Sequence, residues 1–150
     1  RPADPLDGAT PSGASSVTEA LLTAAHLVDG DRAERYLRAA AESLGAHSVL
    51  LDRAPRSAGH WLAVAEAAVR GPLQIAVACD PSGSALLAHA RRLAPGGAIV
   101  VGGEVDSSVL LAGRPRVGGA DAAYVCRGQV CDLPVTTAAE LAAALGVSSR

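Results

Sequence analysis

Two cysteines separated by four residues are the part of this chain whose types and spacing could do chemistry. Cys126 and Cys131 stand on either side of Gly128-Gln129. If these two residues form a tight turn, the flanking strands place the two cysteines opposite each other in a non-hydrogen-bonded pair. The Cα atoms of such a pair lie about 4.5–5.5 Å apart, which is within reach of a disulfide. The segment therefore predicts a β-hairpin whose two cysteines could be joined.

The spacing leaves two interpretations of Cys126 and Cys131 open. A cross-strand disulfide is somewhat strained, and strained bridges are the reducible ones, so the two residues could be a redox-active or regulatory pair. Alternatively, they are small apolar side chains on one face of a hairpin and stay reduced. We favour the second interpretation because buried free cysteine is common. A zinc site is not expected, since no second pair of ligands stands nearby, and we expect neither a metal nor a cofactor.

A second group of polar residues lies in the opening loop, ahead of an expected helix. The carboxyl group of Asp7 could act as an acid or a base, and the hydroxyls of Ser12 and Ser15 could bind the hydroxyls of a sugar. The competing interpretation is turn formation and helix capping, for which the same residue types are suited. We therefore name Asp7 as a candidate catalytic residue and Ser12 and Ser15 as candidate ligand-binding residues.

Two further segments carry weaker signals. Residues 80–84 (Asp-Pro-Ser-Gly-Ser) lie between an expected strand and a helix, where α/β folds bind phosphates, but they lack the fuller glycine fingerprint. A capped turn is the better interpretation. His60 precedes Trp61 on an expected helix, and such a pair could line a pocket, although a partly buried histidine at a helix interface is more usual.

Composition excludes several classes of protein. The chain of 150 residues is 49% apolar and 2% aromatic, so its apolar mass comes mainly from alanine, valine and leucine. The net charge is −2 and no basic run is present, which argues against nucleic acid as a partner. No apolar run reaches the roughly 18–20 residues of a membrane span. Three cysteines do not indicate a disulfide scaffold, and the cytoplasm is the expected compartment.

Apolar residues recur at helical spacing through residues 16–70, where we expect three antiparallel helices. Ser15 or Ser16 is the expected N-cap of the first helix, and Gly30 its end. The second helix is expected from Asp31 to Gly45. The third is expected over residues 57–69.

Residues 72–150 change to a pattern of strands and helices. An apolar run with β-branched residues predicts a buried strand, and a helix and a second strand follow it, which is the pattern of a right-handed parallel βαβ unit. Thr136 is the expected cap of a last helix. The elements expected in this half are a strand at 73–79, a helix at 84–93, a strand at 98–101, a short strand or turn at 109–111, the cysteine hairpin, and a helix at 137–145.

Two segments together resemble one family of large proteins, the spermatogenesis-associated, thioredoxin-domain-containing proteins. Residues 7–15 (D-G-A-T-P-S-G-A-S) are similar to the family's D-G-A-x-P-S-G-N-S loop. Residues 124–134 (Y-V-C-R-G-Q-V-C-D-L-P) are similar to its Y-V-C-x-N-x-x-C-x-x-P segment. The chain departs from the family at Ala14 and Gly128, where the family has asparagine; glycine and asparagine both suit a left-handed turn position.

The resemblance implies a mixed α/β fragment from the C-terminal end of such a protein. Residues 1–71 would be the last helices of a six-hairpin helical toroid similar to sugar epimerases and glycosidases, and residues 72–150 a small α/β region. The implied partners are the upstream toroid and the thioredoxin-like domain of the same protein, and a small carbohydrate ligand. The first hypothesis from this resemblance is a protein that binds or modifies a carbohydrate, with Asp7 and Ser12 at the rim of the toroid. Alternatively, Cys126 and Cys131 could exchange with the thioredoxin-like domain, or the chain could be a purely structural closing module. Helices cut from their ring should also self-associate, since their apolar stripes would be exposed.

Overall fold

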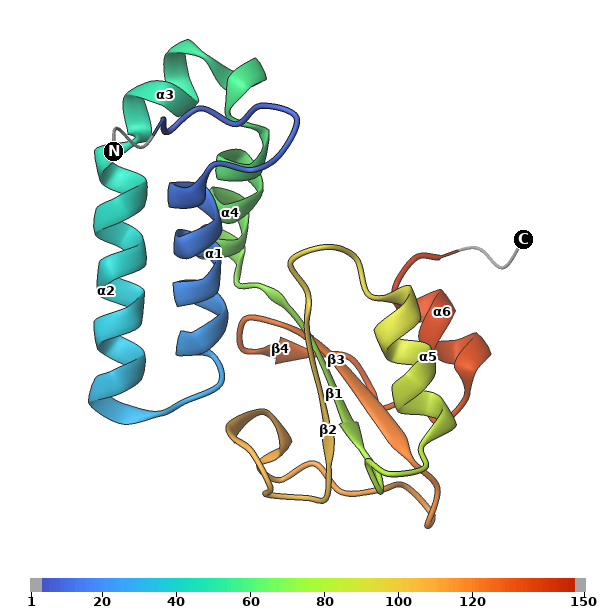
Figure 1. Ribbon diagram of the computed structural model, residues 1–150. Coiled ribbons are helices and arrows are strands. Elements are labelled where there is room, and N and C mark those ends of the chain that lie inside the picture. Colours follow the sequence, from blue (N-terminus) through green and yellow to red (C-terminus); the bar gives the residue numbers. More distant parts are fainter. Residues whose placement is uncertain (1–3, 148–150) are drawn as a thin grey trace. The chain divides into compact units, whose positions relative to one another are not determined.

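The computed structural model describes residues 4–147 and divides into two compact units, Arg1–Gly71 and Pro72–Arg150 (Figure 1). The boundary follows from two residue types. Gly71 has a positive φ of 82°, which suits glycine at the end of a helix, and Pro72 cannot continue a helical hydrogen-bond ladder. That the first unit derives from a toroid stays a prediction.

The first unit is helical. Small and aliphatic side chains on the facing sides of three helices make its core, with Leu22, Ala40 and Val64 buried and Leu21 and Leu44 packed against them. The hydroxyl groups of Thr18 and Ser43 lie 2.7 Å apart and join two of these helices by a polar contact. The elements of this unit are α1 (Gly13–Ala25), α2 (Gly30–Ala46), α3 (Ser48–Arg53), the 3-10 helix η1 (Pro55–Ser57) and α4 (Gly59–Arg70).

The ends of the first helices differ from the sequence expectation. The N-cap of α1 is Ser12, whose hydroxyl oxygen accepts the Ser15 N–H at 3.1 Å, and neither Ser15 nor Ser16 has that position. α1 stops at Ala25, five residues before Gly30, because the chain uses residues 26–29 to reverse direction into α2. Gly30, with a φ of 56°, opens α2 and does not close α1. The short α3 and η1 were not predicted.

The second unit is a four-stranded mixed sheet, which confirms the predicted α/β class, the parallel βαβ unit and the cysteine hairpin. The strand order is β2-β1-β3-β4; β1 and β2 are parallel, and the other pairs are antiparallel. The elements are β1 (Leu73–Ala78), α5 (Ala85–Leu93), β2 (Ile99–Gly103), the 3-10 helix η2 (Val109–Leu111), β3 (Ala122–Arg127), β4 (Val130–Cys131) and α6 (Ala138–Ala144).

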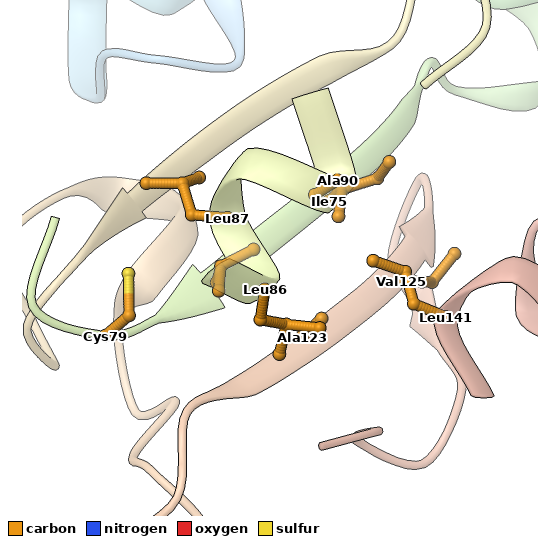
Figure 2. Packing of buried hydrophobic residues seen from close by; sticks show 9 residues of the cluster. Ile75, Cys79, Leu86, Leu87, Ala90, Ala123, Val125 and Leu141 are labelled. Atoms are coloured by element: carbon orange, nitrogen blue, oxygen red, sulfur yellow. The ribbon is translucent and has the colours of Figure 1, made fainter. Parts of the chain in front are cut away.

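Each face of this sheet has its own core. One face packs against α5 and α6, and Figure 2 shows the side chains that meet there: Ile75, Val77, Cys79, Leu86, Leu87, Ala90, Ala123, Val125 and Leu141. The other face is covered by η2 and consists of Ala76, Ala78, Ile99, Leu110 and Leu111, with Val101 and Tyr124 against them. Alanine and glycine let elements approach closely: a Cβ atom added to Gly102 would lie 2.4 Å from Leu87 Cδ2.

The cap of the last helix is Thr137 and not Thr136. Its hydroxyl oxygen accepts the Glu140 N–H at 3.2 Å, and the Glu140 carboxylate accepts the Thr137 N–H at 3.0 Å. In a capping box the acidic residue stands three positions after the cap, with two residues between them, a spacing that Thr137 and Glu140 have and Thr136 and Glu140 do not. Residues 109–111 are a 3-10 helix, although a short strand was the other possibility. In residues 4–147 no helix combines the length and the apolar character that crossing a membrane requires.

Candidate functional site

The two cysteines of the hairpin are joined. Cys126 on β3 pairs with Cys131 on β4, and Arg127 pairs with Val130, which is the register that a turn at Gly128-Gln129 predicts. Gly128 has a φ of 60° in that turn. The structure links the two sulfur atoms in a disulfide with the Cα atoms 3.9 Å apart. It therefore differs from the interpretation of two unlinked thiols, because the two cysteines lie directly opposite each other and close enough for their sulfur atoms to bond.

The two halves of the bridge are unequally accessible. Cys126 is 2% exposed, since β3 lies between β1 and β4. Cys131 is exposed and lies on β4, one of the two edge strands of the sheet. A thiol from solvent or from another protein can therefore approach Cys131 but not Cys126.

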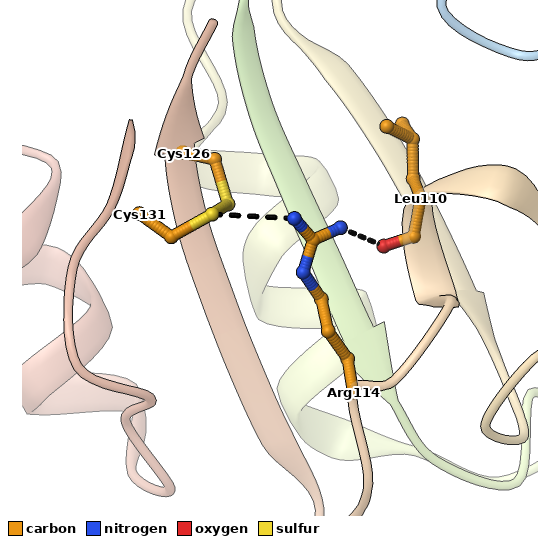
Figure 3. The surroundings of a disulfide bond; sticks show 4 residues. All are labelled: Leu110, Arg114, Cys126 and Cys131. Carbon is orange, nitrogen blue, oxygen red and sulfur yellow. Dashed lines mark hydrogen bonds between the residues drawn. A yellow bond between two sulfur atoms is a disulfide. The ribbon is translucent and has the colours of Figure 1, made fainter. Parts of the chain in front are cut away.

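An arginine contacts the exposed sulfur. The guanidinium group of Arg114 places Nη2 3.2 Å from Cys131 Sγ, and its Nη1 donates to the carbonyl oxygen of Leu110 (Figure 3). Sequence reasoning missed Arg114, because the contact joins residues 17 apart and no local pattern announces it. Only the path of the loop after η2 brings this side chain to the bridge.

A cavity of about 260 Å³ borders the same hairpin. Its volume is below that of ordinary small-molecule sites. The lining residues are Leu73, Val125, Cys126, Arg127, Val130, Asp132, Ala144 and Leu145.

Asp7, the candidate catalytic residue, caps a helix that is distant in sequence. Its Oδ2 accepts the backbone N–H groups of His60 at 2.8 Å and Trp61 at 3.2 Å, in the first turn of α4. The residue at the N-cap position of α4 is Ala58, which has no side-chain acceptor, so Asp7 supplies the acceptor in its place. Its Oδ1 accepts Ser12 N–H and Ser15 Oγ–H.

These hydrogen bonds set the charge state of Asp7. Burial raises the pKa of the Asp7 carboxyl group, but hydrogen bonds from Ser12, Trp61, Ser15 and His60 outweigh burial and hold that pKa below its usual value of 3.8. Asp7 is therefore ionised at neutral pH, and both carboxylate oxygens are used within the protein. Its catalytic role stays a prediction that these contacts do not support.

The two candidate ligand-binding serines are buried. Ser12 is 7% exposed and Ser15 is 0% exposed. Ser15 Oγ lies 2.9 Å from His60 Nδ1, and His60 Nε2 lies 3.3 Å from a carboxylate oxygen of Glu19. A serine, a histidine and a glutamate in this order suggest nucleophilic catalysis, but a substrate cannot reach a hydroxyl that is fully buried. The arrangement is a polar junction between the opening loop, α1 and α4.

Sequence reasoning also missed Glu19 in this junction. A signal for it existed, because Ser15 and Glu19 are four residues apart on α1 and therefore share a face. His60 was noted only as a neighbour of Trp61. The ring of Trp61 instead stacks on His47, with the ring centroids 4.3 Å apart, and it is fully buried.

In the described part of the chain, no group of three or more His, Cys, Asp or Glu residues is arranged to hold a metal ion. No protein-family model matches the chain, and neither does a curated protein or a solved structure. The resemblance of residues 7–15 and 124–134 to thioredoxin-domain-containing proteins accordingly stays a prediction.

Proposed function

We propose that Cys126 and Cys131 form a reversible disulfide that exchanges with the thiols of a partner. The observation that carries this proposal is the position of the bridge, which joins a buried cysteine to an exposed cysteine on an edge strand. Thiol–disulfide exchange depends on which sulfur a partner thiol can reach, and of the two bridge residues Cys131 is the exposed one.

The exchange is balanced as a two-electron transfer. When the bridge closes, the Cys126 and Cys131 thiols lose two electrons and two protons, and a partner disulfide takes them up and becomes a dithiol. When the bridge opens, a partner dithiol gives the same electrons and protons back. The partner that we propose is a thioredoxin-like domain, on the basis of the resemblance of residues 124–134.

A thiol–disulfide titration tests the proposal. The protein is equilibrated across a series of glutathione redox buffers, trapped with an alkylating agent and weighed by mass spectrometry. We expect Cys126 and Cys131 to open together, at a potential near the −270 mV or so of thioredoxins. Cys79 is free and buried, and serves as an internal control that should not change with the buffer.

Two results would contradict the exchange function. Both cysteines could be alkylated in every buffer, which would mean that the bridge does not form. The bridge could also stay closed in the most reducing buffer, which would make it a permanent structural link. Cys126→Ser and Cys131→Ser establish that the mass change belongs to this pair.

We also propose that the first unit is the last part of a helical toroid. Support comes from large apolar side chains that this unit leaves in solvent: Val17, Val49 and Val69 are 61%, 65% and 87% exposed. A ring of further helices would cover such side chains. The chain on its own should therefore self-associate, with a mass above that of a monomer in analytical ultracentrifugation. A monomer at all concentrations would count against the toroid.

A further inference from the structure

We infer that Cys131 is the cysteine that bonds to the partner, and that Arg114 is the positioning residue that holds its sulfur as a thiolate when the bridge is open. This inference rests on the proposed exchange function and gives each residue of the site a part in it. It concerns a residue that no sequence pattern singles out, and it follows from the contacts around the bridge.

Arg114 is held in place from two directions. Its Nη1 donates to the carbonyl oxygen of Leu110, and its backbone N–H donates to the carbonyl oxygen of Leu111 at 3.1 Å. Leu110 and Leu111 are 6% and 1% exposed, because their side chains pack against the sheet. Arg114 is therefore hydrogen-bonded to two residues of the core. Nη2 of its guanidinium group points at Cys131 Sγ (Figure 3).

The positive charge of Arg114 lies beside the sulfur atom of Cys131. Among the described residues Arg114 forms no ion pair, whereas Arg116 pairs with Glu104 and with Asp121. An arginine is positively charged at every pH of interest, and a positive charge beside a cysteine favours the thiolate over the thiol. The charged residues next to the cysteines along the chain are Arg127 and Asp132.

The reaction then has a defined order. The Cys131 thiolate attacks a sulfur of the partner disulfide, a bond forms between Cys131 Sγ and that sulfur, and the second partner sulfur leaves as a thiolate. Cys126 then loses its proton and attacks Cys131 Sγ, which closes the bridge and releases the first partner sulfur as a thiolate. Cys126 is buried and paired with Cys131 across the hairpin, so it can reach this sulfur but not the partner.

The test compares thiols in variants that cannot form the bridge. Cys126→Ser leaves Cys131 as a free thiol, and its rate of alkylation by iodoacetamide is measured against pH, with peptide mapping to separate it from Cys79. Adding Arg114→Gln should slow alkylation at pH 7 about tenfold and move the pH midpoint up by about one unit. Arg92→Gln is the matched control, because Arg92 is an exposed arginine of α5, on the opposite face of the sheet, and should change nothing.

Arg114→Lys distinguishes an effect of the positive charge on Cys131 from an effect of the substitution on folding. It keeps the positive charge, so the rate of Cys131 alkylation should recover in part relative to Arg114→Gln. Equal rates for Cys126→Ser with and without Arg114→Gln would overturn the inference. So would faster alkylation of Cys126 in Cys131→Ser than of Cys131 in Cys126→Ser.

The glutathione titration of the protein that keeps both Cys126 and Cys131 distinguishes a failure of the exchange function from a failure of the role given to Arg114. If the bridge opens and closes but Arg114→Gln leaves the alkylation rate unchanged, the exchange function stands and the role of Arg114 is wrong. If the bridge never opens, the exchange function fails, and the role of Cys131 in it fails as well, whatever the effect of Arg114.

Discussion

Replacing Trp61 by alanine is expected to lower the free energy of unfolding of the first unit by about 3–5 kcal/mol. Trp61 is the largest fully buried side chain of the protein. Its ring stacks on His47, and its indole N–H donates to the carbonyl oxygen of Pro5 at 2.8 Å. Truncation removes the stack, leaves that carbonyl without its donor and opens a cavity that alanine-rich helices cannot refill.

Trp61→Phe is the matched variant. It keeps an aromatic ring beside His47 but loses the N–H donor, so the expected loss is about 1–2 kcal/mol. Both variants remove the only tryptophan, so unfolding in urea is followed by circular dichroism, and hydrogen exchange of peptides from residues 4–71 locates the loss. A loss below about 1 kcal/mol for Trp61→Ala would contradict the packing described for this unit.

Replacing Asp7 by alanine is expected to lower the free energy of unfolding of the first unit by about 2 kcal/mol. The change removes the acceptor for two N–H groups at the start of α4 and for the buried hydroxyl of Ser15. Asp7→Asn keeps one acceptor oxygen without the charge and should cost about half as much. Asp4→Ala is the control, because Asp4 is exposed and its carboxylate accepts the N–H of Leu6, two residues along the same loop.

The Asp7 contribution should depend on pH. The pKa of Asp7 is lower in the folded protein than its usual value of 3.8. The ionised form therefore stabilises the fold fully above that value, and the contribution is lost as pH falls through the lower folded pKa. Urea unfolding at neutral and acid pH should show a difference between Asp7→Asn and the parent protein that shrinks below about pH 4. A constant difference would show that the charge of Asp7 does not act on α4.

These results also bear on the carbohydrate prediction. If Asp7 acted on a sugar, replacing it would abolish stabilisation by that sugar and leave folding alone. Its contacts predict the reverse, which is a loss of stability without any ligand. The stability of Asp7→Ala is the measurement that separates the two roles.

Local patterns were enough to predict the strands and helices named below in the second unit, although not the cap of α6. The apolar run of β1, the turn residues around α5 and the Gly128-Gln129 turn each act over a few residues, so the parallel βαβ unit and the register of Cys126 with Cys131 follow from the sequence. Helix ends were less predictable. Ser12, Ser15 and Ser16 are all suitable caps, and the packing of the opening loop on α4 decides that Ser12 is used.

The sequence by itself determined the fold class of the second unit, the helical character of the first, and the cross-strand register of the two cysteines, but not the disulfide between them. Only the tertiary structure decided the parts played by Asp7 and Arg114. Asp7 meets α4 across 53 residues, and Arg114 meets Cys131 across 17. The physical reason is the range of the interactions: turns, caps and strand register depend on neighbours in the chain, whereas the environment of a charged side chain depends on which distant segments the packed core brings beside it.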